Sequence, residues 1–479
     1  MAFGASVFGS FHFDDYSLFS DPVVTSPSGW LHVWEPLRTR PLTYSTFWLN
    51  YQLGGRDPIG YHLVNLLLHL ACVWMLFGAL RPLMPAKAAF IAAGIFAVHP
   101  IQSEAVNYVF ARSTLLMTFF CIVALWFWTR GRHWTAVLWF ALALLSKEEC
   151  VAFPLFLFLL YLSISRNSRE LKPIFAMILL SVAAGLRVLF AIAVTPGAAA
   201  GVRSNVPTWT YLGAQGGVIW RYVSLVVWPT GFSVDPDVDA VPDWWAWLAL
   251  IALLVLSAKY ASRARAGFWF IAGFVLLLPS SSFFSASDLA ADRRMYLPMV
   301  AFAAAVGLLV QTWNTGVLAT VCLALASVSL VRTHVWSEEV SLWTDAVDKA
   351  PQKVRPRIHL ARALQPQQAL EQLTVANQLE PNSPLVAQEL GRVYLEMNQP
   401  EKALSEFGRE LAIAPNDPLA LTNRGVALML LHQTDAAKQD FARALQIDPC
   451  LNEARSNAQR TGVPVPPANG CKTVIPESK

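Results

Sequence analysis

Ten apolar runs follow one another before residue 331, and they limit what this chain can fold into. They cover residues 61–80, 88–100, 113–129, 134–146, 150–164, 173–195, 244–258, 267–283, 295–311 and 315–331. A helix needs about 20 apolar residues to cross a bilayer, and several runs are near the short end of that range. The chain is 55% hydrophobic and 14% charged, whereas soluble domains are about a quarter charged. We predict an all-α protein whose residues 1–331 form a polytopic membrane bundle.

The loops between these runs alternate in charge. Short basic loops cover residues 81–87, 130–133, 165–172 and 259–265, whereas acidic residues gather in the alternate loops. Because basic loops stay on the cytoplasmic side, the N-terminus is predicted to be cytoplasmic and the C-terminal region external. The alternation stays in phase only if 195–243 is one external loop, with 211–228 at the interface.

The first residues form an apolar segment that is too short to span a membrane. Residues 1–13 also lack the basic segment and the small-residue cleavage site of a signal peptide. We interpret them as part of an incomplete first helix, which brings the predicted number of spans to eleven.

Prolines recur every 34 residues in the C-terminal region, at Pro381, Pro415 and Pro449. The same spacing relates Gly391 to Gly425, Ala403 to Ala437 and Phe407 to Phe441. A period of 34 residues is that of tetratricopeptide repeats, which are stacked helical hairpins. We predict a tetratricopeptide-repeat α-solenoid over 332–460, with a degenerate first unit, and a flexible tail over 461–479. Such an array presents a groove to a peptide or protein.

Charge and cysteine content exclude some partners. The net charge is +4 without a continuous basic patch, so we predict no nucleic-acid partner. The six cysteines follow no metal or redox spacing, and we predict no protein metal site. Cys450 and Cys471 could pair in an oxidising compartment.

Four polar clusters fall on the predicted external side of the membrane domain. They are Asp14-Asp15, the pair Glu104 and Arg112, Lys147-Glu148-Glu149, and Asp292-Arg293-Arg294. Ionisable residues near membrane helices are costly and often mark function. A carboxylate can take a proton from an acceptor hydroxyl while cations hold a departing phosphate. A structural interpretation stays open for each cluster: a solvated helix end, a surface ion pair, or anchors for lipid headgroups.

Four stretches of the chain resemble a known family. They are RPLTYSTFWLNYQLGGRDPIGYHLVNLLLH (40–69), FAVHPIQSEAVNYVFAR (96–112), LLSKEE (144–149) and ADRRMYLP (291–298), followed by the repeats. The chain resembles the transmembrane and tetratricopeptide-repeat-containing proteins, which are O-mannosyltransferase-like members of the GT-C glycosyltransferase superfamily. The resemblance covers most of the chain.

The resemblance implies an enzyme that takes a sugar, mannose by analogy, from a polyprenyl-phosphate carrier and passes it to Ser or Thr of exported proteins. Such enzymes carry an acidic motif in the first external loop, where Asp14 and Asp15 stand, and Asp15 is the favoured base for an inverting displacement. The substrate-binding residues implied by the same carry-over are Arg40, Glu104, Arg112, Lys147, Glu148, Arg293 and Arg294. The repeats would recruit the acceptor protein. Whether the enzyme needs a divalent cation stays open.

Two other functions fit parts of the sequence. A membrane-anchored scaffold or envelope assembly factor would use the repeats without any chemistry. A transporter would need polar residues near the bilayer midplane, and few charges other than Arg187 lie inside the apolar runs. No N-x-Ser/Thr sequon occurs, which suits a bacterial inner membrane with the repeats on the periplasmic side.

Overall fold

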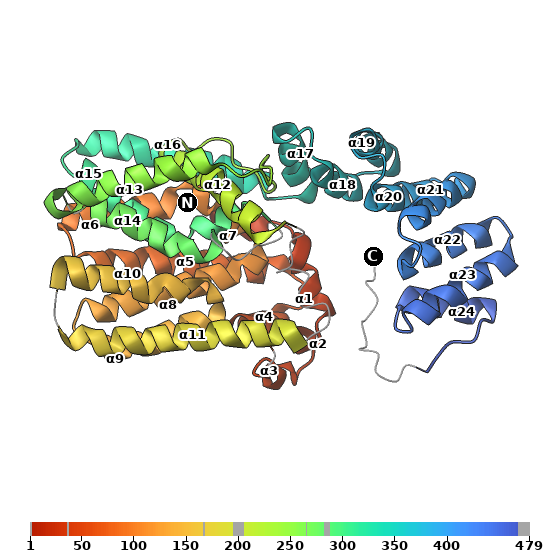
Figure 1. Cartoon of the computed structure of the whole chain (residues 1–479), viewed down its shortest axis with the longest axis horizontal. Helices are drawn as coiled ribbons and strands as arrows, with labels where there is room; N and C mark the ends of the chain where they lie inside the picture. The colour runs from red at the N-terminus through yellow and green to blue at the C-terminus, as the bar shows by residue number, and fades with distance from the viewer. Residues whose placement is uncertain are drawn as a thin grey trace. The chain divides into compact units, whose positions relative to one another are not determined.

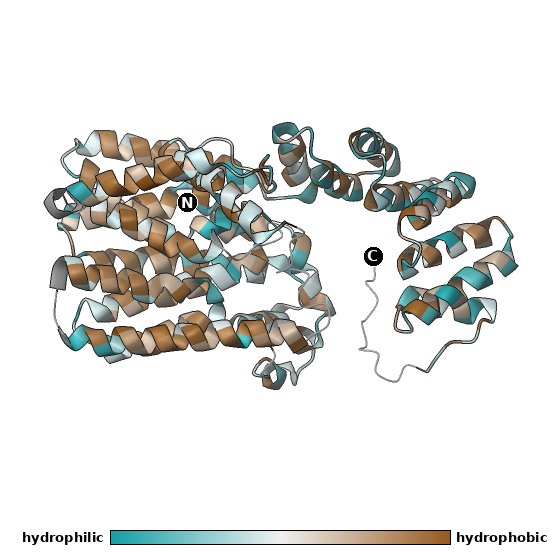
Figure 2. Ribbon diagram, viewed as in Figure 1, coloured by the Kyte–Doolittle hydropathy of each residue, from teal (hydrophilic) through white to brown (hydrophobic). Residues whose placement is uncertain are grey.

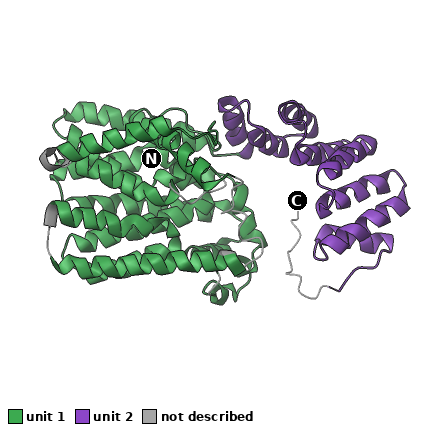
Figure 3. Cartoon of the chain, in the orientation of Figure 1, with its two compact units in different colours: residues 1–338 green, residues 339–479 purple. Residues whose placement is uncertain are grey.

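The computed structural model describes residues 2–35, 38–165, 168–194, 206–264, 266–281 and 288–467. Within these ranges the chain forms helices joined by loops and contains no strand, which confirms the all-α prediction. Two compact units divide the chain, Met1–Glu338 and Glu339–Lys479 (Figure 3). The first unit extends past the predicted boundary at residue 331 because helix α16 continues to Val335.

The first unit consists of long apolar helices and short connecting turns (Figure 1). Its longer helices are α4 (Pro41–Gly54), α5 (Pro58–Leu80), α6 (Ala86–Val98), α8 (Arg112–Trp128), α9 (His133–Ser146), α10 (Phe153–Leu160), α11 (Leu171–Val194), α12 (Thr208–Val227), α13 (Trp244–Ala264), α14 (Ala266–Leu277), α15 (Pro298–Val310) and α16 (Thr315–Val335). Four short elements carry most of the predicted site residues: η2 (Phe13–Asp15), α7 (Ser103–Asn107), η5 (Glu148–Ala152) and η10 (Asp292–Met295). The turns η3 (Pro100–Gln102) and η4 (Val109–Ala111) flank α7. The remaining short elements are η1 (Gly4–Phe8), α1 (Ser17–Ser20), α2 (Pro22–Thr25), α3 (Gly29–His32), η6 (Tyr161–Ser165), η7 (Ser168–Glu170) and η9 (Leu278–Ser280).

Each predicted apolar run coincides with a helix, but many of these helices are short. Within the described ranges, four helical segments are long and apolar enough to cross a membrane: Pro58–Leu80, Val109–Trp128, Ser168–Ala191 and Thr315–Val335. The helices Ala86–Val98 and Pro100–Asn107, bent by 51° relative to each other, would make a fifth span if they cross together. Pro100 breaks this pair, since proline removes a helical hydrogen bond and clashes with the preceding turn. Shorter apolar helices cover His133–Ser146, Trp244–Lys259, Ala266–Ser280 and Pro298–Val310.

Some predicted boundaries differ from the structure. The N-terminal segment forms the 3₁₀ helix η1, and the Phe3 ring packs edge-on against His69 with centroids 5.2 Å apart. The predicted loop 259–265 is helical as far as Ala264. Helix α12, which contains the ambiguous run 211–228, is not among the candidate spans found in the described ranges.

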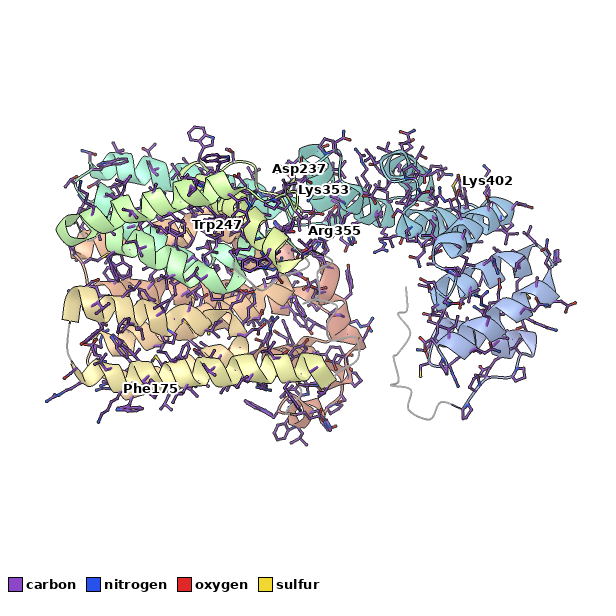
Figure 4. All side chains as sticks on the ribbon, in the orientation of Figure 1. Phe175, Asp237, Trp247, Lys353, Arg355 and Lys402 are labelled. Carbon is purple, nitrogen blue, oxygen red and sulfur yellow. The ribbon has the colours of Figure 1, made fainter. Side chains whose placement is uncertain are left out.

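Apolar side chains cover the outside of the first unit as well as its core. Hydrophobic residues dominate its helices in Figure 2, and only 17% of the most apolar window of α11 is buried. Phe175 is 61% exposed on the outer side of this helix (Figure 4). A large apolar surface of this kind marks contact with another apolar phase. The first unit is therefore an integral membrane domain.

The second unit consists of helices that pack in sequence as antiparallel pairs. They are α17 (Glu339–Lys349), α18 (Val354–Ala363), α19 (Pro366–Leu379), α20 (Pro384–Glu396), α21 (Pro400–Ile413), α22 (Pro418–Leu430), α23 (Thr434–Ile447) and α24 (Asn452–Thr461). Each periodic proline follows the second helix of a pair, so the predicted repeats are confirmed. The start of the predicted tail is packed, because Val463 and Val465 contact the core of the last helices.

Candidate functional site

The two predicted catalytic carboxylates lie in different environments. Both belong to η2, but Asp15 is fully buried whereas Asp14 is exposed. The carboxylate of Asp15 accepts hydrogen bonds from the backbone N–H groups of His12, at 2.9 Å, and Phe110, at 2.7 Å. It thereby fastens the N-terminal segment to η4.

Burial raises the pKa of Asp15 to about 8, because the charged form loses its hydration. The backbone N–H donors of His12 and Phe110 lower the pKa, and the neighbouring Asp14 raises it slightly. A buried group whose oxygens are both engaged cannot readily reach an acceptor hydroxyl. Asp15 anchors the N-terminal segment in this structure, and its role as the base stays a prediction.

Asp14 is held from outside its own segment. The hydroxyl of Tyr108 donates a hydrogen bond of 2.9 Å to its carboxylate. Tyr108 is itself buried, and its ring stacks on Trp336 with centroids 6.1 Å apart. The carboxylate of Asp14 is thus exposed to solvent but fixed in direction.

Glu104 pairs with Arg293, which brings together two predicted residues that are far apart in sequence. The guanidinium of Arg293 forms an ion pair with Glu104, and its backbone N–H donates to the same carboxylate at 2.9 Å. Asp288 is a second partner of the guanidinium, at 3.2 Å. Glu104 is buried, while Arg293 stays partly exposed.

Arg294 forms hydrogen bonds with the backbone of the segment just before it, residues 288–289. Its guanidinium donates to the backbone carbonyls of Asp288, at 2.7 Å, and Leu289, at 3.0 Å. Nearby, Arg221 of α12 forms a 2.6 Å ion pair with Asp292. These contacts hold the residues on either side of Arg293, while the predicted contact of Arg294 with substrate stays a prediction.

Arg112 is fully buried and does not form the predicted surface pair with Glu104. It donates to Asn65 at 2.9 Å, to Asn50 at 2.6 Å and to the Tyr61 carbonyl at 3.0 Å. Its guanidinium also lies 4.5 Å from the centroid of the Phe47 ring. Arg112 therefore joins α4, α5 and α8, and its role as a substrate ligand stays a prediction.

Two further ion pairs meet at the acidic turn η5, one made by Arg40 and one by Lys147. Arg40 makes an ion pair with Glu148, including a 3.0 Å hydrogen bond from Nε. Burial opposes ionisation of Glu148, but the charge and hydrogen bonds of Arg40 outweigh it and lower the pKa of Glu148 to about 2. Lys147 is buried, pairs with Glu149 at 2.8 Å and donates to Thr114 at 3.0 Å.

Electrostatic interactions connect these clusters into one region. Burial lowers the pKa of Lys147, and the positive charges of Arg40 and Arg293 lower it further. Burial likewise raises the pKa of Tyr108, to which the charges of Asp14 and Asp15 contribute, whereas Arg293 opposes them. The structure thus gathers Asp14, Glu104, Lys147 and their partners around one polar region of the membrane domain.

Sequence reasoning missed three contributors to this region. Tyr108, Asp288 and Arg221 contact predicted residues, but each contact crosses an element boundary that the sequence does not show. Tyr108 lies inside the stretch 96–112, which carries part of the family resemblance, and this position was the signal in the sequence that could have marked it. Within the described ranges, no group of three or more His, Cys, Asp or Glu is arranged to hold a metal ion.

Comparisons with known proteins agree with this architecture. The family described as "Dolichyl-phosphate-mannose-protein mannosyltransferase" matches residues 38–194. "Protein O-mannosyl-transferase F38B6.6" of Caenorhabditis elegans is 27% identical over 406 residues, which is 74% of this chain and 57% of that protein. "Protein O-mannosyl-transferase TMTC3" of Homo sapiens is 33% identical over 174 residues, 30% of this chain and 18% of that protein.

Over part of its length the chain is thus similar to protein O-mannosyl-transferases. Apolar helices and repeats are both present, in the order that the sequence predicts. The chain spans little more than half the length of the C. elegans relative.

Among solved structures, the ArnT protein of Cupriavidus metallidurans, crystallised bound to undecaprenyl phosphate, is similar over 92% of this chain and 77% of its own. The sequences are 14% identical and the TM-score is 0.37, which is too low to support a shared fold.

Proposed function

We propose that this chain is a membrane glycosyltransferase that moves mannose from a polyprenyl-phosphate carrier to Ser or Thr hydroxyls of exported proteins. The observation that carries the proposal is the exposed carboxylate of Asp14, oriented by Tyr108, whose hydroxyl also experiences the charge of the paired cation Arg293. The names of the relatives support the same reaction class.

Asp14 is the proposed general base. Its carboxylate takes the proton of the acceptor hydroxyl while the hydroxyl oxygen forms a bond to the anomeric carbon of the sugar. The bond from that carbon to the phosphate oxygen breaks, the electron pair leaves with the phosphate, and the configuration inverts. General-base catalysis of this kind contributes about 10²–10⁴-fold. Exposure and the Tyr108 hydrogen bond support Asp14 over the buried Asp15 for this role.

Three cations are proposed to stabilise the phosphate that departs. Arg293 is partly exposed and held in place by Glu104 and Asp288, while Arg40 is held by Glu148. Lys147 adds a buried positive charge to the same region. Fixed cations act more strongly in a site of low dielectric constant than they would in water.

The repeat unit is proposed to recruit the acceptor protein on the periplasmic side of a bacterial inner membrane. The alternation of basic and acidic loops in the membrane domain supports this side, because basic loops stay on the cytoplasmic side.

The experiment that tests the proposed function uses the purified full chain in lipid nanodiscs. Polyprenyl-phosphate mannose and a Ser/Thr-rich peptide are added, and mannosylated peptide is measured by mass spectrometry. The proposal expects product that requires both the donor and the chain. Repeats that bind exported proteins without any sugar transfer would instead favour the scaffold function.

A further inference from the structure

The chain that follows helix α16 returns to the segment that carries Asp14. Trp336 comes directly after this helix and is only 2% exposed. Its ring lies against the rings of His12, Phe13 and Tyr108, with centroids 5.6, 6.3 and 6.1 Å away. The first two directly precede Asp14 in sequence, and Tyr108 donates the hydrogen bond that orients the Asp14 carboxylate. Trp336 therefore contacts both the segment before the proposed base and the side chain that directs it.

Backbone groups of the same stretch bind the N-terminal segment. The Trp336 carbonyl lies 2.8 Å from Nε2 of His12. The Ser337 carbonyl accepts hydrogen bonds of 3.0 Å from the backbone N–H of Ser10 and from its hydroxyl. Burial lowers the pKa of His12 to about 4, so its ring is neutral near pH 7, and Nε2 carries the proton because a carbonyl only accepts. These bonds fasten residues 10–12 to the end of α16.

The last turn of α16 also contacts the helix that carries Glu104. Thr333 is buried one turn before the end of α16, and its hydroxyl accepts a 3.4 Å hydrogen bond from the side chain of Asn107. Asn107 is the last residue of α7, which also carries Glu104, the partner of Arg293. The end of α16 is thus fixed against two groups of site residues.

We propose that Trp336 is a positioning residue for the proposed reaction, because its ring holds Tyr108 and the segment before Asp14 so that the carboxylate keeps one direction. The inference rests on the proposed function, since it names what keeps that base in place. Aromatic pairs add stabilisation beyond the apolar area that they bury. A displacement of about 1 Å at a reacting group can slow a reaction about a hundredfold. A ring that fixes Asp14 in this way affects the rate without taking part in the proton transfer.

Steady-state kinetics of the full chain in lipid nanodiscs test the proposal. Trp336→Ala should lower kcat for sugar transfer about tenfold and leave the KM for the donor unchanged. Trp336→Phe, which keeps a ring beside Tyr108, should recover most of the loss. Trp336→Leu keeps apolar volume without a ring and should behave like Trp336→Ala, so the test holds even if the smaller side chain impairs folding.

Trp313→Ala is the matched control. Trp313 precedes α16 at its other end and is 48% exposed. Both kcat and KM of this variant should stay at the wild-type values.

Hydrogen exchange, measured by mass spectrometry, reports the same contact without any sugar transfer. The backbone amides of residues 10–16 should exchange about tenfold faster in Trp336→Ala and Trp336→Leu than in wild type, because the segment opens more often. The amides of α5 and α8 should keep their wild-type rates. Trp336→Phe and Trp313→Ala should exchange like wild type throughout.

The outcomes separate this inference from the proposed function. Faster exchange confined to residues 10–16, in a chain that transfers no sugar, would support the hold of Trp336 on the Asp14 segment and contradict the reaction. Wild-type exchange of this segment in Trp336→Ala and Trp336→Leu, or a wild-type kcat in both, would overturn the positioning role even if transfer persists. Faster exchange across α5 and α8 as well would also overturn it, because Trp336 would then stabilise the whole domain.

Discussion

The hydroxyl oxygen of Tyr108 lies 2.9 Å from the carboxylate of Asp14, although 94 residues separate them in sequence. The ring of Tyr108 is fixed between Trp336 and Phe13, whose centroids lie 6.1 and 5.6 Å away. A hydroxyl held by such packing can orient a carboxylate that is otherwise exposed. Tyr108 is therefore a positioning residue for the proposed base.

Replacing Tyr108 with phenylalanine should lower kcat for sugar transfer about tenfold and leave the KM for the donor unchanged. One hydrogen bond to a charged group contributes about 1.5–3 kcal/mol, and this bond aims the base without contacting the donor. Steady-state kinetics measure the effect. Tyr16→Phe is the matched control, since that hydroxyl donates to the Phe11 carbonyl instead. A rise in KM at constant kcat would contradict the positioning role.

Asp15→Asn should change how stability depends on pH. The pKa of Asp15 is about 8 in the folded chain, above its ordinary value of 3.8, so the folded state binds the extra proton. Its contribution to stability is complete below pH about 4 and is lost as pH rises through about 8. The wild-type thermal midpoint should therefore fall over this window relative to that of Asp15→Asn. Parallel curves for the two proteins would show that Asp15 is ionised throughout.

The ion pair of Arg40 and Glu148 should appear as coupling in a double-mutant cycle. Arg40→Gln and Glu148→Gln should each destabilise the chain, and the double variant should lose less than the sum, with a coupling of about 0.5–3 kcal/mol. The pKa of Glu148 is lowered to about 2, so this stability is present above pH about 4.5 and is lost as pH falls toward 2. Denaturant unfolding in detergent at several pH values measures both effects. Additive losses at neutral pH would exclude a stabilising pair.

Gly391→Ala should destabilise the repeat unit by about 1–3 kcal/mol. A Cβ at this position would lie 2.5 Å from the Phe407 ring, which is itself fully buried. Gly408→Ala is the control on the neighbouring helix α21, because its Cβ would meet no atom within 4 Å. Thermal unfolding should show the first variant less stable and the control unchanged or slightly more stable, since alanine favours helix. Equal midpoints would mean that the helices of this repeat do not pack closely.

Local patterns in the sequence predicted much of the fold. Apolar runs predicted helices, and the 34-residue period predicted stacked helical hairpins. In the structure Gly391 faces Phe407 and Gly425 faces Phe441 within these hairpins. These features depend on residues close together in sequence. The length of each helix was less predictable. Interruptions between helices, such as the bend of 51° at Pro100, depend on how the polar turns pack.

The site was predictable in its residue types but not in its pairings. The sequence shows that Glu104 and Arg293 are ionisable, yet 189 residues separate them, and only the fold brings them together. The sequence favoured Asp15 over Asp14 as the base, but it does not show that Asp15 is buried and Asp14 exposed, because burial depends on the fold. The substrate-binding roles of Arg112 and Arg294 stay predictions; in the structure their guanidinium groups bind the protein interior and the loop before η10.

In the proposed reaction, Asp14 takes the proton from the acceptor hydroxyl. The decisive measurement is the single-turnover rate of mannose transfer from a polyprenyl-phosphate donor to a Ser/Thr peptide, for wild type and for Asp14→Asn. Asp14→Asn should transfer mannose about a hundredfold or more slowly, with donor binding and helical content unchanged. Transfer by Asp14→Asn at the wild-type rate would exclude Asp14 as the base.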